Sequence, residues 1–226
     1  MNLLALDTSS LACAVGLVAG ETRHLRHAEE AREHTRLLLP MIRDVLAEGG
    51  LSPADLDAIV LGNGPGSFIG LRIAASVAAG LGYAAGRPIV PVSSMAAVAM
   101  QVGSPGDTVA VTQDAHMNQV YLGLYRLDER GVALPAIEEC LQPVVPIPEL
   151  RGQAVIAAGA GWIRYPALLD ANRADIRRLS DVQFPAATAL LDLGARAFAA
   201  GATVAPDAIR PAYLRHDVAA VPRATP

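Results

Sequence analysis

The sequence of 226 residues contains no lysine, since all 18 basic residues are arginine. Every mechanism that needs a lysine side chain is therefore excluded, including the phosphate lysine of a Walker loop and a Schiff base. The two cysteines, Cys13 and Cys140, lie in separate apolar stretches and form no Cys-x-x-Cys pair. This pattern favours two buried, reduced thiols. The net charge of −4 argues weakly against a broad nucleic-acid-binding face.

Transmembrane and leader patterns are also missing. No uninterrupted apolar run of membrane-spanning length is visible. Residues 1–7 (MNLLALD) have no basic segment and reach an acid too early for a signal peptide. We therefore expect a cytoplasmic protein without a membrane segment. The chain is 52% hydrophobic, which provides a sizeable core for one large domain or two small ones.

Strand, turn and helix patterns begin twice along the chain. The first half predicts strands over 3–6, 11–18, 22–27, 57–61 and 89–92, and helices over 29–48, 67–85 and 93–101. Pro40 is expected to kink the first helix or to divide it. After a linker at 103–106, the second half predicts strands over 108–114, 119–127 and 154–158, a Pro-rich stretch over 143–148, and helices over 161–170 and 185–200.

Both halves start with a strand that ends in an acid and continue into a second strand. Three antiparallel strands joined to parallel strand–helix units describe an RNase H-like domain. We therefore predict an α/β fold of two RNase H-like lobes in the actin and sugar-kinase (ASKHA) architecture, over 1–104 and 105–226. The boundary is soft, because the last helix could pack back on the first lobe.

A glycine-rich turn at 62–72 (GNGPGSFIGLR) joins a predicted strand to the helix over 67–85. It is neither a Walker loop nor a dinucleotide fingerprint, because no Gly-Lys-Ser/Thr follows and Ser67 takes the third glycine position. Its backbone N–H groups could hold an anion. Alternatively, its glycines let the helix lie close to the sheet, and we favour this interpretation.

Chemical candidates are few. Asp7 with Thr8, and Asp114, could hold a hydrated magnesium ion beside a nucleotide phosphate. Neither corner carries the glycines that a close phosphate approach requires, so nucleotide binding is a weak hypothesis. His34 has Leu38 four residues on, so the helical pair of metal-binding histidines is absent. We predict no catalytic residue, no metal site and no cofactor.

The predicted helix over 67–85 is apolar on nearly every side, so both of its faces must be covered. One face can lie on its own sheet. The other would leave an apolar patch that a monomer rarely exposes. The helix over 29–48 carries a broad apolar stripe of its own and is one possible cover. The alternative, which we favour, is a partner protein bound to these two helices.

Several segments, in order along nearly the whole chain, resemble one family. They are residues 4–9 (LALDTS), 34–40 (HTRLLLP), 64–72 (GPGSFIGLR), 91–95 (PVSSM), 114–116 (DAH) with 120–121 (VY), and 211–215 (PAYLR). The chain closely resembles the TsaB (YeaZ) family of tRNA threonylcarbamoyladenosine biosynthesis proteins. It departs from the family where Ile69 replaces a usual threonine and His116 a usual arginine, which puts an anion contact at 116 in doubt.

The resemblance implies a non-catalytic scaffold or activator that binds TsaD. TsaD is the paralogue that transfers a threonylcarbamoyl group to N6 of adenosine 37 in tRNAs reading codons that begin with A. The family binds TsaD through its first two helices, forms homodimers through the same surface when alone, is joined by the ATPase TsaE, and reaches tRNA through the complex. The contact residues expected here are Leu37, Met41, Leu71, Ala74, Ala75, Ala78 and Leu81.

TsaD carries its metal on a His-x-x-x-His pair, and this chain offers His34 but Leu38 at the matching positions. The residue pattern and the resemblance therefore both favour a non-catalytic role. The alternative is an enzyme in its own right. It would be an ASKHA-type phosphotransferase using Asp7 and Asp114, or a metallopeptidase-like enzyme.

Overall fold

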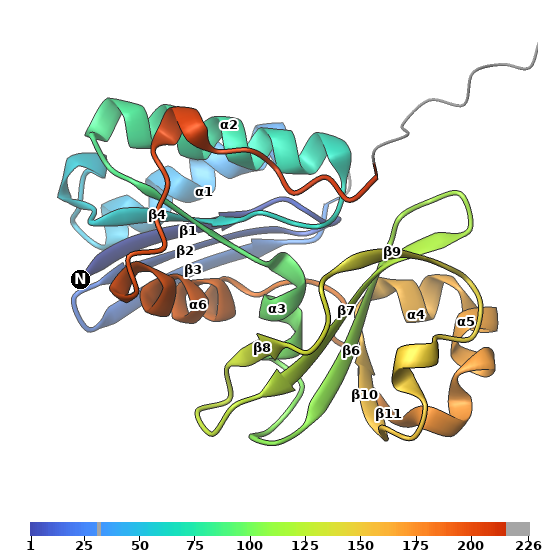
Figure 1. Cartoon of the computed structure of the whole chain (residues 1–226). Coiled ribbons are helices and arrows are strands. Elements are labelled where there is room, and N and C mark those ends of the chain that lie inside the picture. The colour runs from blue at the N-terminus through green and yellow to red at the C-terminus, as the bar shows by residue number, and fades with distance from the viewer. Residues whose placement is uncertain (31–32, 216–226) are drawn as a thin grey trace, which may run out of the picture.

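The first of two sheets has the strand order β3-β2-β1-β4-β5 in the computed structural model, which describes residues 1–30 and 33–215 (Figure 1). The β1–β2 and β2–β3 pairs are antiparallel, whereas β1–β4 and β4–β5 are parallel. The strands are β1 (Asn2–Asp7), β2 (Cys13–Ala19), β3 (Thr22–Ala28), β4 (Ala58–Gly62) and β5 (Ile89–Val92).

The second sheet repeats this arrangement with the order β11-β10-β6-β7-β8, and β9 also pairs with β7. The β6–β7 and β7–β8 pairs are antiparallel, and β6–β10 and β10–β11 are parallel. The strands are β6 (Thr108–Asp114), β7 (Gln119–Leu127), β8 (Ala133–Pro135), β9 (Cys140–Pro143), β10 (Val155–Ala158) and β11 (Ile176–Leu179). The predicted fold of two RNase H-like lobes is therefore confirmed.

Helices cover both faces of the first sheet. Leu4 and Leu6 of β1 belong to the core under α1 (His34–Glu48) and α2 (Phe68–Ala85). Leu3 and Ala5 point to the opposite face and pack with α6 (Ala187–Ala199). Because successive residues of a strand face opposite sides, a strand covered on both faces is apolar at every position. This explains the unbroken apolar run of β1.

The helix α3 (Ser94–Ala99) connects the two sheets and packs against the second (Figure 1). Ser93 caps it, because its Oγ accepts a hydrogen bond of 3.0 Å from the Ala96 N–H. The other face of the second sheet is covered by α4 (Ala160–Arg164) and α5 (Pro166–Ala171). Short 3₁₀ turns η1 (Pro53–Asp55), η2 (Pro148–Leu150), η3 (Arg173–Asp175) and η4 (Pro206–Ala208) complete the described chain.

Two helix predictions need correction. The first helix begins at His34 rather than at residue 29, and it continues through Pro40 without division. Glu29 and Glu30 lie outside it, because their charged side chains add nothing to the apolar face that packs the helix, which starts with the buried His34. The helix predicted over 161–170 is two helices. Pro166 lacks an N–H and favours an extended Tyr165, which has φ −124° and ψ 83°.

Three short strands were not predicted. β8 and β11 contain three and four residues, and most of their side chains are exposed. β9 ends at Pro143, where the irregular Pro-rich stretch was expected to start. Strands this short show no alternation over enough positions to be recognised. They form because β7 and β10 offer them an edge.

Candidate functional site

A groove of about 420 Å³ runs between the first turns of α1 and the N-terminal half of α2. Ser67 starts α2 as its N-cap, and its Oγ accepts a hydrogen bond of 3.2 Å from the Gly70 N–H. We call this feature the α1–α2 groove. Its lining residues are Thr35, Leu38, Leu39, Phe68, Ile69, Arg72, Ile73, Ser76 and Val77.

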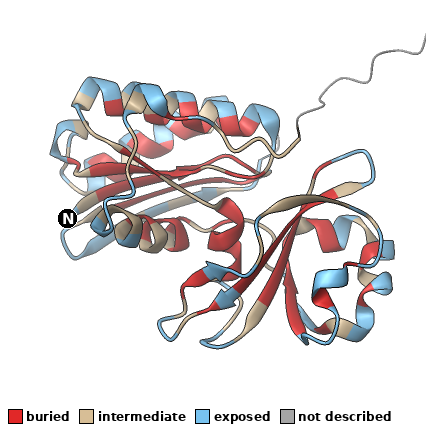
Figure 2. Cartoon of the chain, in the orientation of Figure 1, coloured by how far each residue is buried: buried red, intermediate tan, exposed pale blue. Residues whose placement is uncertain are grey.

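The surface around the groove is apolar and open to solvent. Ile69 of α2 is 70% exposed, and Leu39 of α1 is 55% exposed. Figure 2 shows α2 with an exposed outer side and a buried side toward the sheet. By length and hydropathy α2 could also cross a membrane, a property it shares with core helices of globular proteins. Large apolar side chains that stay exposed beside a groove, as Ile69 and Leu39 do, are typical of an interaction site.

One cation stands at the edge of the groove. The Arg72 guanidinium lies 3.8 Å from the centre of the Phe68 ring, and Arg72 Nε donates a 2.8 Å hydrogen bond to the Tyr213 hydroxyl. The Phe68 and Tyr213 rings are 5.3 Å apart. Cation–π contact and a hydrogen bond together restrict the Arg72 side chain to one position. The side of the groove formed by Phe68 and Arg72 is therefore ordered in the isolated protein.

The structure places the seven predicted contact residues mostly inside the isolated chain. Five of the seven are buried inside the chain, and Leu37 and Leu81 are half-buried against the same core. The buried five are Met41, Leu71, Ala74, Ala75 and Ala78. The larger apolar residues Phe68, Ile69 and Tyr83 of α2 are exposed.

Gly70, Ala74 and Ala78 of α2 face the sheet, because the helix lies very close to β1 and to the turn after it. A Cβ atom on Gly70 would fall inside 3.0 Å of the Thr8 carbonyl oxygen, and one on Gly66 would meet the Ser9 carbonyl oxygen. The Ser67 N–H donates to that same Ser9 oxygen at 2.7 Å. These N–H groups and glycines thus serve packing, in agreement with the favoured interpretation of the turn. The steric demand at Gly70 also sets which side of α2 faces outward.

Asp7 lies in the interior and has no exposed surface. Its Oδ1 accepts hydrogen bonds from the Ser9 N–H (2.7 Å) and Ser9 Oγ (2.8 Å), and its Oδ2 accepts one from Ser94 Oγ. Burial raises the pKa of this carboxyl, and the bonds to Ser94 and Ser9 oppose the shift. Thr8 is also fully buried, and its Oγ1 donates to the Gly70 carbonyl at 2.7 Å. Asp7 and Thr8 therefore stabilise the end of β1 through internal hydrogen bonds, and their side chains offer no surface to a nucleotide.

Asp114 occupies the matching corner of the second lobe and is partly exposed. Its Oδ1 accepts hydrogen bonds of 2.8 Å from the His116 N–H and from the Tyr165 hydroxyl. The His116 ring stands 3.3 Å from Oδ2 and is 84% exposed. Asp114 thus stabilises the turn that follows β6. Within residues 1–30 and 33–215, no cluster of three or more His, Cys, Asp or Glu side chains is placed to hold a metal ion.

His34 lies at the start of α1, and its side chain is largely buried. Among the described residues, its Nε2 has no hydrogen-bond partner. One turn further along α1, the position that a second metal ligand would need is taken by the buried Leu38.

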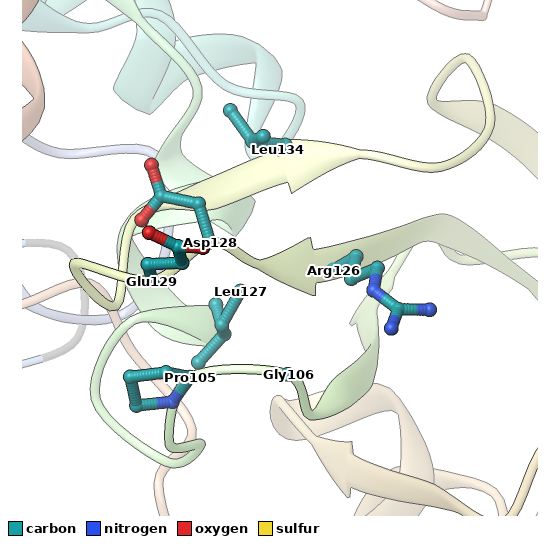
Figure 3. Close-up of a pocket in the computed structure, with 7 residues that line it drawn as sticks. All are labelled: Pro105, Gly106, Arg126, Leu127, Asp128, Glu129 and Leu134. Atoms are coloured by element: carbon teal, nitrogen blue, oxygen red, sulfur yellow. The ribbon is translucent and has the colours of Figure 1, made fainter.

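A second hollow of about 480 Å³ lies between the loop after α3 and the β7–β8 hairpin (Figure 3). Its charged side chains do not converge, because Arg126 points away from Asp128 and Glu129 (Figure 3). Asp128 accepts hydrogen bonds from the N–H groups of Arg130 (2.9 Å) and Val132 (2.8 Å) in its own turn. This hollow offers no chemistry comparable with that of the α1–α2 groove. The remaining lining residues are Pro105, Gly106, Leu127 and Leu134.

Comparison with known proteins agrees with this architecture. The family described as TsaD, tRNA N6-adenosine threonylcarbamoyltransferase, matches residues 28–177. The chain is 35% identical to the tRNA threonylcarbamoyladenosine biosynthesis protein TsaB of Escherichia coli K12, over 97% of this chain and 96% of that protein. It is 32% identical to TsaB of Haemophilus influenzae, over 96% and 95% of the two chains.

Solved structures show the same likeness. A Pseudomonas aeruginosa protein described as similar to peptidase YeaZ superposes with a TM-score of 0.85 at 36% identity, covering 95% of this chain and 99% of that one. A second structure, YeaZ from Pseudomonas aeruginosa, gives a TM-score of 0.83 at 36% identity, with coverage of 94% and 99%.

Proposed function

The chain belongs to the TsaB family of tRNA threonylcarbamoyladenosine biosynthesis proteins, and on this premise we propose that it is a non-catalytic scaffold or activator subunit. It binds a TsaD-type catalytic paralogue and supports transfer of the threonylcarbamoyl group to N6 of adenosine 37, in tRNAs that read codons beginning with A. It does this in the cytoplasm and reaches tRNA only through the complex.

The α1–α2 groove is the observation that carries this proposal. Its apolar lining, the exposed Ile69 and Leu39, and the ordered Arg72 form a surface suited to a protein partner. Interfaces concentrate their energy in such apolar and arginine anchors. When the protein is alone, a second copy covers the same surface as a homodimer. A TsaE-type ATPase joins the assembled pair.

The filled corners of the two lobes support a non-catalytic role. Asp7 and Thr8 are buried in internal hydrogen bonds, and Asp114 is held by its own turn and by Tyr165. A phosphotransferase needs its carboxylates open to a metal ion and to phosphate. No feature of the described chain favours phosphotransferase or peptidase chemistry over the scaffold function.

The test is a charge placed on the groove. Ile69→Asp should weaken binding of the TsaD-type protein from the same organism by about tenfold or more, because a carboxylate would have to lose its water inside an apolar interface. Isothermal titration calorimetry measures the affinity, and gel filtration of the isolated protein should show loss of the homodimer.

Leu134→Asp is the matched control, since Leu134 is an exposed leucine of the second lobe (48% exposed) and lies outside the groove. It should bind like the unmodified chain. Unchanged affinity for Ile69→Asp would place the interface elsewhere. Turnover of ATP by the isolated protein would overturn the non-catalytic role.

A further inference from the structure

The last described segment of the chain connects the two lobes. After α6, Val204 pairs with Ile89 at the edge of the first sheet through hydrogen bonds of 2.8 and 2.9 Å. The chain then runs along α2 (Figure 1). Ile209 packs into the first-lobe core, and Asn63 holds the segment through its side-chain bond to the Arg210 carbonyl at 3.0 Å. We call residues 209–215 the C-terminal strap.

The strap changes lobes within three residues. Tyr213 contacts Phe68 and Arg72 of the first lobe. Leu214 packs against the apolar core of the second lobe. Arg215 Nη2 donates hydrogen bonds to the Ala115 carbonyl (2.8 Å) and to Gln119 Oε1 (2.7 Å). A single short segment therefore holds both lobes at once.

The anchor point in the second lobe is a turn that needs support. His116, Met117 and Asn118 all adopt left-handed backbone conformations, with φ of 59°, 53° and 57°. Residues other than glycine rarely take this conformation, and three in succession are costly. The guanidinium of Arg215 bonds residues on both sides of the turn, Ala115 and Gln119. The strap is therefore part of what keeps this turn folded.

The anchor point in the first lobe is the groove itself. Phe68 and Arg72 line the α1–α2 groove, and Tyr213 holds them from the side of the strap. A partner that binds the groove would contact side chains whose positions depend on Tyr213. Tyr213 depends in turn on where the second lobe holds Arg215, two residues further along.

We propose that the C-terminal strap clamps the two lobes at a fixed separation and so couples that separation to partner docking in the α1–α2 groove. Tyr213 and Arg215 are positioning residues in this device. Loss of either end lets the lobes move and leaves the groove wall disordered. A partner that docks then has to order the side chains of this wall on binding. Its affinity for the protein falls for this reason, although the groove residues are unchanged. The coupling rests on the function proposed above, whereas the clamp does not.

The experiment uses the full chain with Cys140→Ser, and with spin labels at Ala84→Cys on α2 and Asp170→Cys on α5, both exposed positions. Pulsed electron spin resonance then measures the distance between the lobes. With an intact strap we expect one narrow distance distribution. Arg215→Ala should broaden it and weaken binding of the TsaD-type partner about fivefold, at the lower end of coupling between sites.

Arg210→Ala is the matched control, because within the part of the chain that the structure describes the Arg210 side chain bonds only the nearby carbonyls of Asp207 and Ile209. It should change neither the distance nor the affinity. Tyr213→Phe keeps the ring and removes the hydroxyl that Arg72 bonds. It should weaken docking while the lobe distance stays narrow. If Arg215→Ala fails to fold, Gln119→Ala, which removes the Oε1 acceptor of Arg215, replaces it in both measurements with the same expected results.

The outcomes separate the two proposals. A narrow distribution and unchanged affinity in Arg215→Ala would overturn the strap as a clamp. A broadened distribution with unchanged affinity would overturn its coupling to docking. If the unmodified chain binds no TsaD-type partner, the proposed function fails, and the distances still decide the clamp.

Discussion

Gly70→Ala tests the close contact that positions α2. Gly70 lies in the first turn of this helix, and its carbonyl accepts the 2.7 Å hydrogen bond from the buried Thr8 hydroxyl. A Cβ at this position would fall well inside 3.0 Å of the Thr8 carbonyl oxygen, which is backbone and cannot rotate away. The start of α2 would have to move off the corner by about 1 Å, a large shift in a close-packed interior.

The cost can be worked from three contributions. Overpacking of a tight interior costs about 1–3 kcal/mol. Loss of the Thr8–Gly70 hydrogen bond adds about 1 kcal/mol. Replacing glycine by alanine within a helix returns about 1 kcal/mol. We therefore expect a net loss of about 2 kcal/mol in the free energy of unfolding, which for a chain of this size lowers the melting temperature by about 4–8 °C.

Urea unfolding followed by circular dichroism measures this loss as a lower midpoint at an unchanged slope. Gly80→Ala is the control on the same helix, because a Cβ on the exposed Gly80 meets no atom within 4 Å. It should stabilise the chain by about 0.5–1 kcal/mol through helix propensity alone. If Gly70→Ala were as stable as Gly80→Ala, packing against Thr8 would not be what sets the position of α2.

Two further changes probe buried groups. Asp7→Asn should flatten the pH dependence of stability, because the raised pKa of Asp7 means that stability falls as pH rises from the ordinary value near 3.8 through the folded-state pKa. Urea titrations at several pH values should show that the free energy of unfolding of the variant matches or exceeds that of the unmodified chain at neutral pH. An equal dependence of this free energy on pH in both chains would contradict the prediction. Gly194→Ala in α6 would push a Cβ into Val60 of β4, so we expect a loss of about 1–3 kcal/mol by overpacking. Calorimetry that shows an unchanged melting temperature would mean that α6 is not tightly seated on the first sheet.

Much of the fold could be predicted because its signals are local. β1 and β6 are each an apolar strand ending in an aspartate and followed by a turn and a second strand, and both predicted units are present at the expected places. The capping residues Ser67 and Gly86 indicated both ends of α2. The elements that were missed, such as β11, are short strands that depend on a neighbour's edge rather than on their own pattern.

The candidate surface could be assigned to α1 and α2, but not to particular residues. In a helix that is apolar all round, the pattern does not say which side meets the sheet. The small residues, Ala74 and Ala78 among them, were expected outside and lie inside. A steric clue was present, since the glycines before Arg72 implied a close backbone approach. That clue identifies the inner face only once Thr8 is known to lie opposite Gly70.

The amino-acid pattern alone was sufficient for the repeated unit of strand, aspartate, turn and strand and for the apolar α2, because each depends on residues close together in sequence. The family followed from the resemblance of several short motifs. Contacts between distant segments required the folded chain. Tyr213 meets Arg72 across 141 positions, and Arg215 meets Gln119 across 96. No local periodicity encodes such pairs, since they form only after both sheets, α6 and the strap have taken their places. The outward face of α2 and the connection between the lobes were therefore settled by tertiary packing.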